Sequence, residues 1–513
     1  MIIVYHNKKN VVRIEGVENH FFSKNKAIGW VLFNLAQQFP VEILVWCDIN
    51  WEQALNKENI EKIFHHKKMM VSFNPYFSNI INDGLGYVDN GSILIINKEV
   101  SYFSWQMSSI VGAVPSNVLN TIINQVKNKN ENFDYLLNSI AKSAIILGLF
   151  CYSEPSLLKN KLQIEEGKKN SNYTLFKFVK QHYHIKWIVM LFVNFLFFEN
   201  KIMLFPLIYS FFFKRRIWDK NILDSIEVKS NKIVRVTNEI DVIIPTIGRS
   251  NYLYDVLCDL CNQTHLPKNV IIVEQNTAEG SETELNFIIE EHWPFRIEHV
   301  FTHKSGACNA RNIALSKTKS EWVFLNDDDN RIEIDVIEKT LNKCIQFGVE
   351  AVVNNYLQVY EQHEFNKIHQ TTIFGSGCSF VKSNYLKNIK FNSKFEFSYG
   401  EDFDFGMQLR NIGVDVIYFP SPAILHLKAP MGGFRIKPTF KWDTDDFLPK
   451  PSPTIMLNNL VYKTQQQLFG YKMIYYYKLF SGNWFQNPIQ FFKTTNKHWE
   501  ASMLWANKLK DND

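Results

Sequence analysis

The sequence has little net charge, few cysteines and no obvious targeting segment. Its 56 basic and 51 acidic residues leave a formal charge of only +5, so composition does not call for a nucleic-acid partner. The seven cysteines are odd in number and scattered, which fits a reducing cytoplasm better than a disulfide scaffold. No basic segment followed by a long apolar stretch opens the chain, so no secretory signal is expected. A length of 513 residues allows two or three domains with substantial cores.

Long apolar runs are also missing, although two shorter ones occur at residues 187–198 and 202–213. Each is shorter than the ~20 residues of a membrane-spanning helix. Spanning the bilayer together would bury the charges of residues 199–201, which is costly. Two interpretations stay open. The runs form a buried helical pair that links domains, or they lie in the plane of the inner membrane face, with the basic residues 214–216 near anionic headgroups.

The densest charge in the chain is Asp327-Asp328-Asp329, which follows directly after the apolar segment 322–326. Adjacent carboxylates repel one another, and burial without a partner would be expensive. Mg²⁺ and Mn²⁺ prefer oxygen ligands, and Mg²⁺ usually combines one or two carboxylates with substrate phosphates. The run therefore indicates a cation that carries a nucleotide diphosphate. The alternative is a solvated acidic turn in which Asn330 and Asp335 cap the next helix.

Strands and helices alternate around this run. We expect strands at 240–244, 269–276 and 295–301, and helices near 251–263, near 281–291 and from within 305–312. Such alternation predicts right-handed crossovers and a mostly parallel sheet. Ligands of such sheets bind beyond the carboxyl ends of the strands, where the polar clusters of this sequence fall.

The remaining segments give coarser predictions. Strands are expected at 1–6, 41–47 and 92–96, and helices near 25–38, 51–65 and 115–147. Together they predict a separate α/β module. Residues 373–380 read as a further strand, whose glycines would allow the backbone to approach a sugar closely. Another strand begins near Asp415. The aromatic-rich segment after Lys437 has helical spacing.

Five motifs in order resemble those of the family 2 glycosyltransferases, which have the GT-A fold. They are Pro245-Thr246 with Arg249, Glu274-Gln275-Asn276, Gly306 with Ala310-Arg311-Asn312, Asn326-Asp327-Asp328-Asp329, and Gly400-Glu401-Asp402. The resemblance covers about residues 240–435. It implies an α/β, mostly parallel sheet flanked by helices and a nucleotide-sugar donor, for which a UDP-sugar is favoured.

The resemblance also assigns donor-binding residues, which are Pro245, Thr246, Arg249, Glu274, Asn276, Lys304, Gly306, Arg311, Asp327 and Asp328. The guanidinium of Arg311 suits phosphate because its planar donors bind two oxygens at once. Glu274 stands where the family more often has Asp. Its carboxylate can accept from a base N–H or a ribose hydroxyl, or it can cap a turn.

Metal and catalytic residues follow from the same resemblance. Asp329, Asp327 and His426 are the expected ligands of Mn²⁺ or Mg²⁺. Asp402, next to Glu401, is expected to take the proton from the acceptor hydroxyl, and amides at a helix N-terminus would help keep it ionised. As an alternative, these carboxylates only satisfy the first helical turn. Residues 431–435 read as a mobile loop, from which Arg435 would clamp phosphate.

We therefore expect four regions: an α/β module of unknown role (1–150), a helical apolar linker (151–235), a GT-A domain (236–435) and a helical, aromatic-rich extension (436–513). The predicted function is metal-assisted, inverting transfer of a sugar to a glycan or lipid-linked glycan. The protein is expected in the cytoplasm, with a peripheral membrane contact through 187–213 left open. Two alternatives remain: a non-catalytic glycan-binding or assembly protein, and a sugar nucleotidyltransferase. The single glycine between Pro245 and Ser250 argues against the second.

Overall fold

The structure is a computed structural model of the chain. It describes residues 1–17, 26–91, 95–164, 170–362, 365–429, 439–482 and 487–511. The loop expected at 431–435 and residues 92–94 of the strand expected at 92–96 lie outside these ranges. Contacts divide the chain into two compact units. Unit 1 consists of Met1–Lys229 and Tyr462–Asn487, and unit 2 of Ser230–Val461 and Pro488–Asp513. The four regions expected from the sequence stay a prediction.

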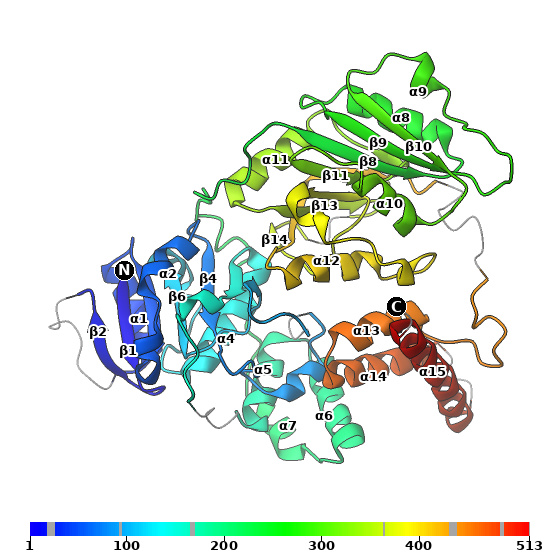
Figure 1. Ribbon diagram of the computed structural model, residues 1–513. Helices are drawn as coiled ribbons and strands as arrows, with labels where there is room; N and C mark the ends of the chain where they lie inside the picture. Colours follow the sequence, from blue (N-terminus) through cyan, green and yellow to red (C-terminus); the bar gives the residue numbers. More distant parts are fainter. Residues whose placement is uncertain are drawn as a thin grey trace. The chain divides into compact units, whose positions relative to one another are not determined.

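Unit 1 is built on a mixed sheet, which has seven strands within the described residues (Figure 1). Their order is β2 (Val11–Glu15), β1 (Ile2–His6), β3 (Ile43–Asp48), β6 (Val111–Pro115), β4 (Met69–Phe73), β7 (Phe150–Ser153) and β5 (Tyr102–Phe103). Strand β1 runs parallel to β3, whereas β6 is antiparallel to both β3 and β4. The strands expected at 1–6 and 41–47 are confirmed as β1 and β3, with bounds shifted by one or two residues. The described residues 95 and 96 are not in a strand.

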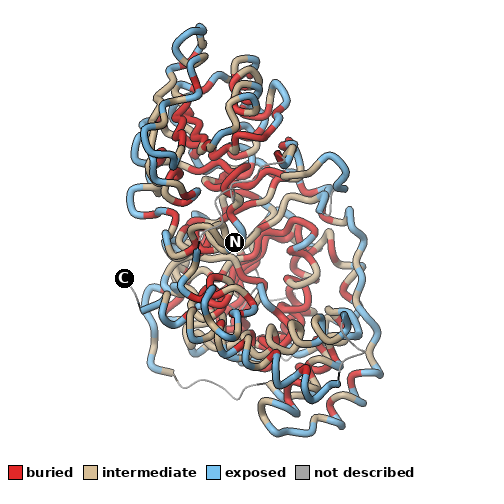
Figure 2. The backbone as a smooth tube through the Cα atoms, turned by 90° about the vertical axis from the view of Figure 1, so that its right-hand side faces the viewer, coloured by how far each residue is buried: buried red, intermediate tan, exposed pale blue. Residues whose placement is uncertain are grey.

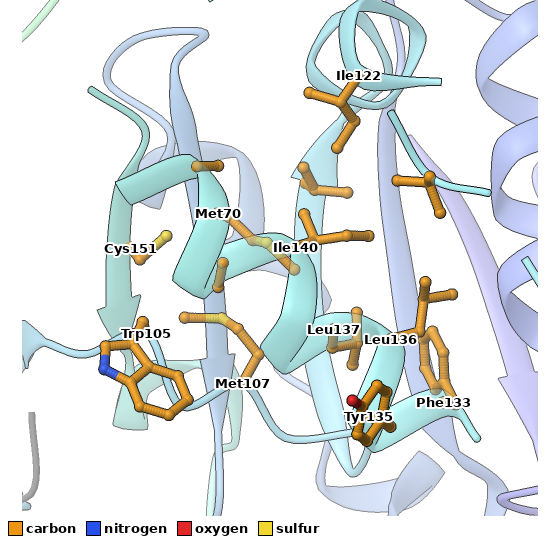
Figure 3. Packing of buried hydrophobic residues seen from close by; sticks show 14 of the residues in the cluster. Met70, Trp105, Met107, Ile122, Phe133, Tyr135, Leu136, Leu137, Ile140 and Cys151 are labelled. Carbon is orange, nitrogen blue, oxygen red and sulfur yellow. The ribbon is translucent and has the colours of Figure 1, made fainter. Parts of the chain in front are cut away.

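Helices surround this sheet and supply its core. They are α1 (Ile28–Gln38), α2 (Lys57–Ile63), α3 (Ser116–Ile122), α4 (Phe133–Ala144), α5 (Asn172–His182), α6 (Lys186–Glu199), α7 (Leu204–Ser210) and α14 (Gln465–Ser481). Figure 3 shows Tyr135, Leu136, Leu137 and Ile140 of α4 gathered with Met70 and Met107 in the buried cluster. Trp105 is also buried there and stacks on Phe178 with ring centroids 5.5 Å apart, so it is a core residue.

The single helix expected near 115–147 is wrong, because the structure has two helices there, α3 and α4. Between them, the Asn128 side chain accepts from the Asn130 amide at 3.0 Å, and Asn132 caps α4 by accepting from the Tyr135 amide at 3.1 Å. Asparagine side chains that bond to nearby amides compete with the helical backbone. The helix expected near 51–65 is likewise split, by the extended residue Leu55, into a 3₁₀ turn (Ile49–Ala54) and α2.

Unit 2 contains a larger sheet, of nine strands within the described residues. Their order is β10 (Arg296–Thr302), β9 (Asn269–Gln275), β8 (Ile240–Thr246), β11 (Trp322–Asn326), β15 (Cys378–Lys382), β13 (Ala351–Leu357), β16 (Ile417–His426) and β12 (Asn330–Arg331), with β14 (His369–Gln370) beside β16. The first four strands are mutually parallel. Beyond β11 the directions are mixed, since β15 is antiparallel to both β11 and β13.

The helices of unit 2 are α8 (Ser250–Cys261), α9 (Phe287–Glu290), α10 (Ala307–Leu315), α11 (Val336–Phe347), α12 (Glu401–Asn411), α13 (Pro453–Tyr462) and α15 (Pro488–Asp511), of which the last residue of α13 belongs to unit 1. The predicted α/β architecture and C-terminal helices are confirmed. The central strands of both sheets are mostly buried, and Figure 2 shows such buried stretches of the chain in red, with exposed stretches in pale blue.

Two boundaries in unit 2 differ from the prediction. The helix expected near 281–291 is only the four-residue α9, because residues 283 and 284 are tied to the end of β9. Thr283 Oγ1 and the Glu284 amide donate to the Glu274 carboxylate at 2.6 and 2.9 Å. The strand expected over 373–380 begins only at Cys378, since the Cys378 amide donates to Gly375 O at 3.2 Å and closes a turn.

Candidate active site

A cavity of about 350 Å³ is lined by residues at the carboxyl ends of β8 and β11 and at the starts of α10 and α12. Figure 1 shows these elements of unit 2 as ribbons. The cavity walls include Pro245, Thr246, Arg249, Gln275, Gly306, Arg311, the three consecutive aspartates, Glu396, Glu401, His426 and Lys428. This is the edge of a parallel sheet where ligands bind. The cavity therefore brings together residues from all five sequence motifs.

Asp327 is held from two sides. Arg311 Nη2 donates to its Oδ1 at 2.9 Å, and the Tyr356 hydroxyl donates to its Oδ2 at 3.0 Å. Arg311 projects from α10 and is buried, and the neighbouring carboxylates raise the pKa of its guanidinium against the opposing effect of burial. A permanently charged donor thus sits at the cavity wall.

The buried carboxylate of Asp328 bonds to residues at the end of β8 and just before α8. Its carboxylate accepts from Thr246 Oγ1 at 2.8 Å and from Arg249 Nη1 at 2.6 Å. Burial raises the pKa of Asp328 to about 6, although Arg249 and Thr246 oppose the shift. Asp328 therefore fixes the turn after β8, where Thr246 ends the strand and Arg249 directly precedes α8.

Asp329 meets His426 because their strands pair. Asn330 of β12 lies opposite His426, the last residue of β16, and this register leaves Asp329 Oδ1 3.5 Å from His426 Nε2. Burial favours the neutral form of Asp329, but His426 and the Ala429 amide, which donates at 2.9 Å, hold its pKa below the ordinary value. The hydrogen bond to Asp329 in turn raises the pKa of His426.

Glu401 and Asp402 occupy the first turn of α12, as the sequence predicted. The Ser376 amide donates to Asp402 Oδ1 at 3.0 Å. Burial, followed by the charge of Asp402, raises the pKa of Glu401 to about 7. Burial also raises the pKa of Asp402, whereas Arg311 and Ser376 lower it. Glu401 lines the cavity, whereas Asp402 is not among its lining residues.

Glu396 is a cavity residue that sequence reasoning missed. Its carboxylate accepts from the amides of Cys308 and Asn309 at 2.9 and 2.8 Å, which caps α10 from a residue 87 to 88 positions later. A carboxylate suits a helix N-terminus because the free amides and the helix dipole favour negative charge. Gly306 has a φ of +139°, and a Cβ there would lie 2.5 Å from the Glu396 carboxylate. Close packing of these two residues therefore requires glycine.

Three of the expected donor-binding residues do not line the cavity. The Glu274 carboxylate accepts from Thr283 and the Glu284 amide and lies 2.9 Å from His299 Nε2, and these contacts hold its pKa below the ordinary value despite burial. Asn276 accepts from the Ala278 amide at 3.1 Å, and Lys304 is exposed. Gln275 lies between Glu274 and Asn276 and does line the cavity, and its Oε1 accepts from the Gly306 amide at 2.6 Å.

The charge of the cavity wall favours a cation. The lining residues include more carboxylates than permanent cations. The five carboxylates belong to Asp327, Asp328, Asp329, Glu396 and Glu401, and the three cations to Arg249, Arg311 and Lys428. Within the described residues, no three His, Cys, Asp or Glu side chains form a ligand set by themselves. Asp329 and His426 do provide an adjacent oxygen and nitrogen. Two protein ligands fit a divalent ion that completes its shell with phosphate and water.

The cavity lies at the sheet edge where α/β domains commonly bind ligands, and its wall combines carboxylates with two arginines. Residues 241–410 match the model described as Glycosyl transferase family 2. This segment therefore belongs to the family 2 glycosyltransferases, and the sheet of unit 2 is the GT-A fold that the motifs predicted.

Individual relatives match over shorter segments. "Glycosyltransferase GlyG" of Streptococcus pneumoniae serotype 4 is 23% identical over 127 residues, which are 25% of this chain and 42% of that protein. "Poly(ribitol-phosphate) beta-N-acetylglucosaminyltransferase TarP" of Staphylococcus aureus is 24% identical over 120 residues, which are 23% of this chain and 36% of that protein. The match thus spans less than half the length of either relative.

Among solved structures, S. aureus TarS 1-349 in complex with UDP-GlcNAc aligns with a TM-score of 0.34 and 18% identity. The alignment covers 44% of this chain and 65% of that chain.

Proposed function

We propose that the chain transfers a sugar, with inversion, from a nucleotide diphosphate sugar to a glycan or lipid-linked glycan acceptor. One observation carries the proposal: Arg311, Asp327, Asp329, His426 and Glu401 line a single cavity. This set combines donors for phosphate, ligands for a cation and a carboxyl at a helix start. The family assignment of residues 241–410 supports the same reaction class.

Donor binding is assigned to the Arg311 side of the cavity. The guanidinium already makes one charged bond to Asp327 and has further N–H groups for phosphate oxygens. Arg249 holds Asp328 and Asp329, at 2.6 and 3.2 Å, and so keeps the acidic run in place. A UDP-sugar is the favoured donor.

Asp329 and His426 would hold Mn²⁺ or Mg²⁺. Asp327, the third ligand expected from the sequence, is instead held by Arg311 and Tyr356. When bound, such an ion neutralises the charge that develops on the leaving diphosphate. The excess of carboxylates over cations on the cavity wall supports this assignment. Without a cation, an anionic donor would be repelled by the net negative charge of the cavity wall.

Asp402 is proposed as the general base, with Glu401 beside it. Asp402 accepts one hydrogen bond from the Ser376 amide, which orients its carboxylate at the start of α12. The nearby positive charge of Arg311 lowers the pKa of Asp402 and favours the ionised form. That ionised form can take the proton of an acceptor hydroxyl as the new glycosidic bond forms.

A polyol or sugar polymer of the cell surface is the acceptor class that we favour. TarP, one of the matched relatives, carries poly(ribitol-phosphate) in its name. The wall that holds Glu401 also contains Phe395, Phe397 and Ser398. Aromatic faces and a hydroxyl there would suit the apolar and polar sides of a sugar.

The test uses Asp402→Asn, with Asp404→Asn as the matched control on the same helix. Asp404 is buried, and its carboxylate accepts from Gln408 at 2.7 Å. We expect Asp402→Asn to lower kcat by roughly a hundredfold or more, while the thermal shift produced by UDP-sugar and Mn²⁺ stays as in the unmodified protein. The control should keep its turnover.

A panel of UDP, GDP, dTDP and CMP compounds, each with Mn²⁺ and with EDTA, measures the donor site separately. A ligand that binds only the folded state raises its melting temperature, so one metal-dependent stabilisation would identify the base. If no compound stabilises the protein, the donor site is wrong. If Asp402→Asn turns over normally, Asp402 is not the base.

A further inference from the structure

The outward face of the helical pair α6 and α7 in unit 1 is apolar. We define the α6–α7 surface by six exposed residues: Val189, Phe197, Leu204, Phe205, Ile208 and Phe212. The phenylalanines are 67%, 73% and 80% exposed for Phe197, Phe205 and Phe212, respectively. Scattered apolar residues are normal on a protein surface, but a continuous apolar face marks an interaction site.

The helices themselves are firmly packed on their other side. Ile188, Leu191 and Phe195 of α6 are fully or almost fully buried in the core cluster of unit 1. Phe198, at the end of α6, stacks on Phe469 of α14 with ring centroids 4.2 Å apart. Pro206 and Ser210 of α7 are buried too. Both helices thus contribute buried side chains to unit 1 and also present apolar side chains to solvent.

Basic residues flank the two helices in the sequence. Lys186 begins α6, Lys201 lies between the two helices, and Lys214 and Arg215 follow α7, all of them exposed. Lys201 is paired with Glu199 at 2.8 Å. Lys186, Lys214 and Arg215 leave the rim positive, with exposed Asp219 as a nearby carboxylate.

Among the helices of the described residues, none combines the length and apolarity needed to cross a bilayer. A short helix can instead lie in the interface plane, with its apolar face at the acyl boundary and its cations among the headgroups. We propose that the α6–α7 surface docks on a bilayer that contains anionic lipid.

Charge complementarity selects this occupant over a second copy of the chain. Two copies that met through the same surface would bring together two rims of the same sign, which is unfavourable. Anionic headgroups attract Lys and Arg near the membrane surface, and the apolar face gains by leaving water. The surface lies outside the sugar-transfer cavity, so docking can be measured without any donor or acceptor.

The test is flotation of the full-length protein with vesicles of phosphatidylcholine alone and of phosphatidylcholine with phosphatidylglycerol. We expect flotation with the anionic vesicles that weakens as salt rises. The double variant Phe205→Ser/Phe212→Ser should bind roughly tenfold or more weakly. Val41→Ser is the matched control because Val41 is 87% exposed in the same unit, outside α6 and α7, and this variant should float normally.

A second variant, Lys214→Glu/Arg215→Glu, leaves the apolar residues in place and should lose the preference for anionic vesicles. It also keeps the proposal testable if the phenylalanine variant fails to fold. Absence of flotation with both vesicle types overturns the proposal, as does unchanged flotation of both variants. Concentration-dependent dimers that disappear in Phe205→Ser/Phe212→Ser, together with no flotation, would assign the surface to a second copy instead.

Discussion

Arg311 Nη2 donates to Asp327 Oδ1 at 2.9 Å, which joins helix α10 to the chain that leaves strand β11. The two residues belong to different sequence motifs and meet on the cavity wall. Because both are charged and Arg311 is buried, their pairing orients the guanidinium before any ligand arrives.

Arg311→Lys tests whether the planar guanidinium matters for the donor. Lysine keeps the charge but cannot present two parallel N–H donors, so we expect kcat/KM for the donor to fall roughly tenfold to hundredfold, mainly through KM. Steady-state kinetics with varied donor measure this. Arg331→Lys is the matched control, since Arg331 makes a two-point contact with Asp259, at 2.7 Å for each bond, outside the cavity. An equal effect in both variants would contradict a specific donor role.

Glu401 should make the stability of the fold depend on pH. Its pKa is raised from 4.5 to about 7 in the folded protein, so between these values the folded state holds more protons than the unfolded state. The stabilisation from this group is therefore complete below about 4.5 and is lost as pH rises through about 7. Glu401→Gln should flatten the curve of melting temperature against pH over this window.

All melting curves are recorded in EDTA, and Glu279→Gln is the control variant. Glu279 is exposed, so its replacement should leave the dependence of melting temperature on pH unchanged. A Glu401→Gln curve that matches the unmodified protein would show that Glu401 titrates normally.

Gly377→Ala should disturb Asp327 from the opposite side. A Cβ at this position would lie 2.1 Å from Asp327 Oδ2 and 3.0 Å from the Tyr356 hydroxyl, so the carboxylate has to move. We expect weaker binding of the donor with Mn²⁺, by roughly tenfold, because a displaced carboxylate loses charge-assisted contacts. Titration calorimetry measures the affinity. Gly91→Ala is the control, because a Cβ at Gly91 would have no heavy atom within 4 Å. This variant should bind the donor with unchanged affinity.

Much of unit 2 follows from local sequence signals. The strands β8, β9 and β11 are continuous apolar runs that end in polar residues, and such runs are typical of a buried parallel sheet. The pairing of Asp329 with His426 could only be suggested by the family motifs, because it depends on the register of β12 against β16.

Other parts of the site had no local signal. Glu396 reaches two amides of α10 across more than eighty residues of chain, and nothing near Glu396 in the sequence predicts that contact. Tyr356 looks like an ordinary strand residue until β13 brings its hydroxyl to Asp327 and to Asn330. Glu274 was expected at the donor from the family resemblance, yet its carboxylate is held by the loop that follows β9.

The chain passes between the two units three times, after Lys229, Val461 and Asn487. Neither unit is therefore one continuous piece of polypeptide. A fragment ending at residue 435 would lose Asn458, which donates to Gly400 O at 3.0 Å just before the proposed base, and Thr454, which lies 2.7 Å from Ser398. Ending the chain at Lys229 would remove the partner of Phe198. Residues 241–410 thus depend on contacts from outside this segment. Transferring the segment to another protein would also require the C-terminal helices that contact it.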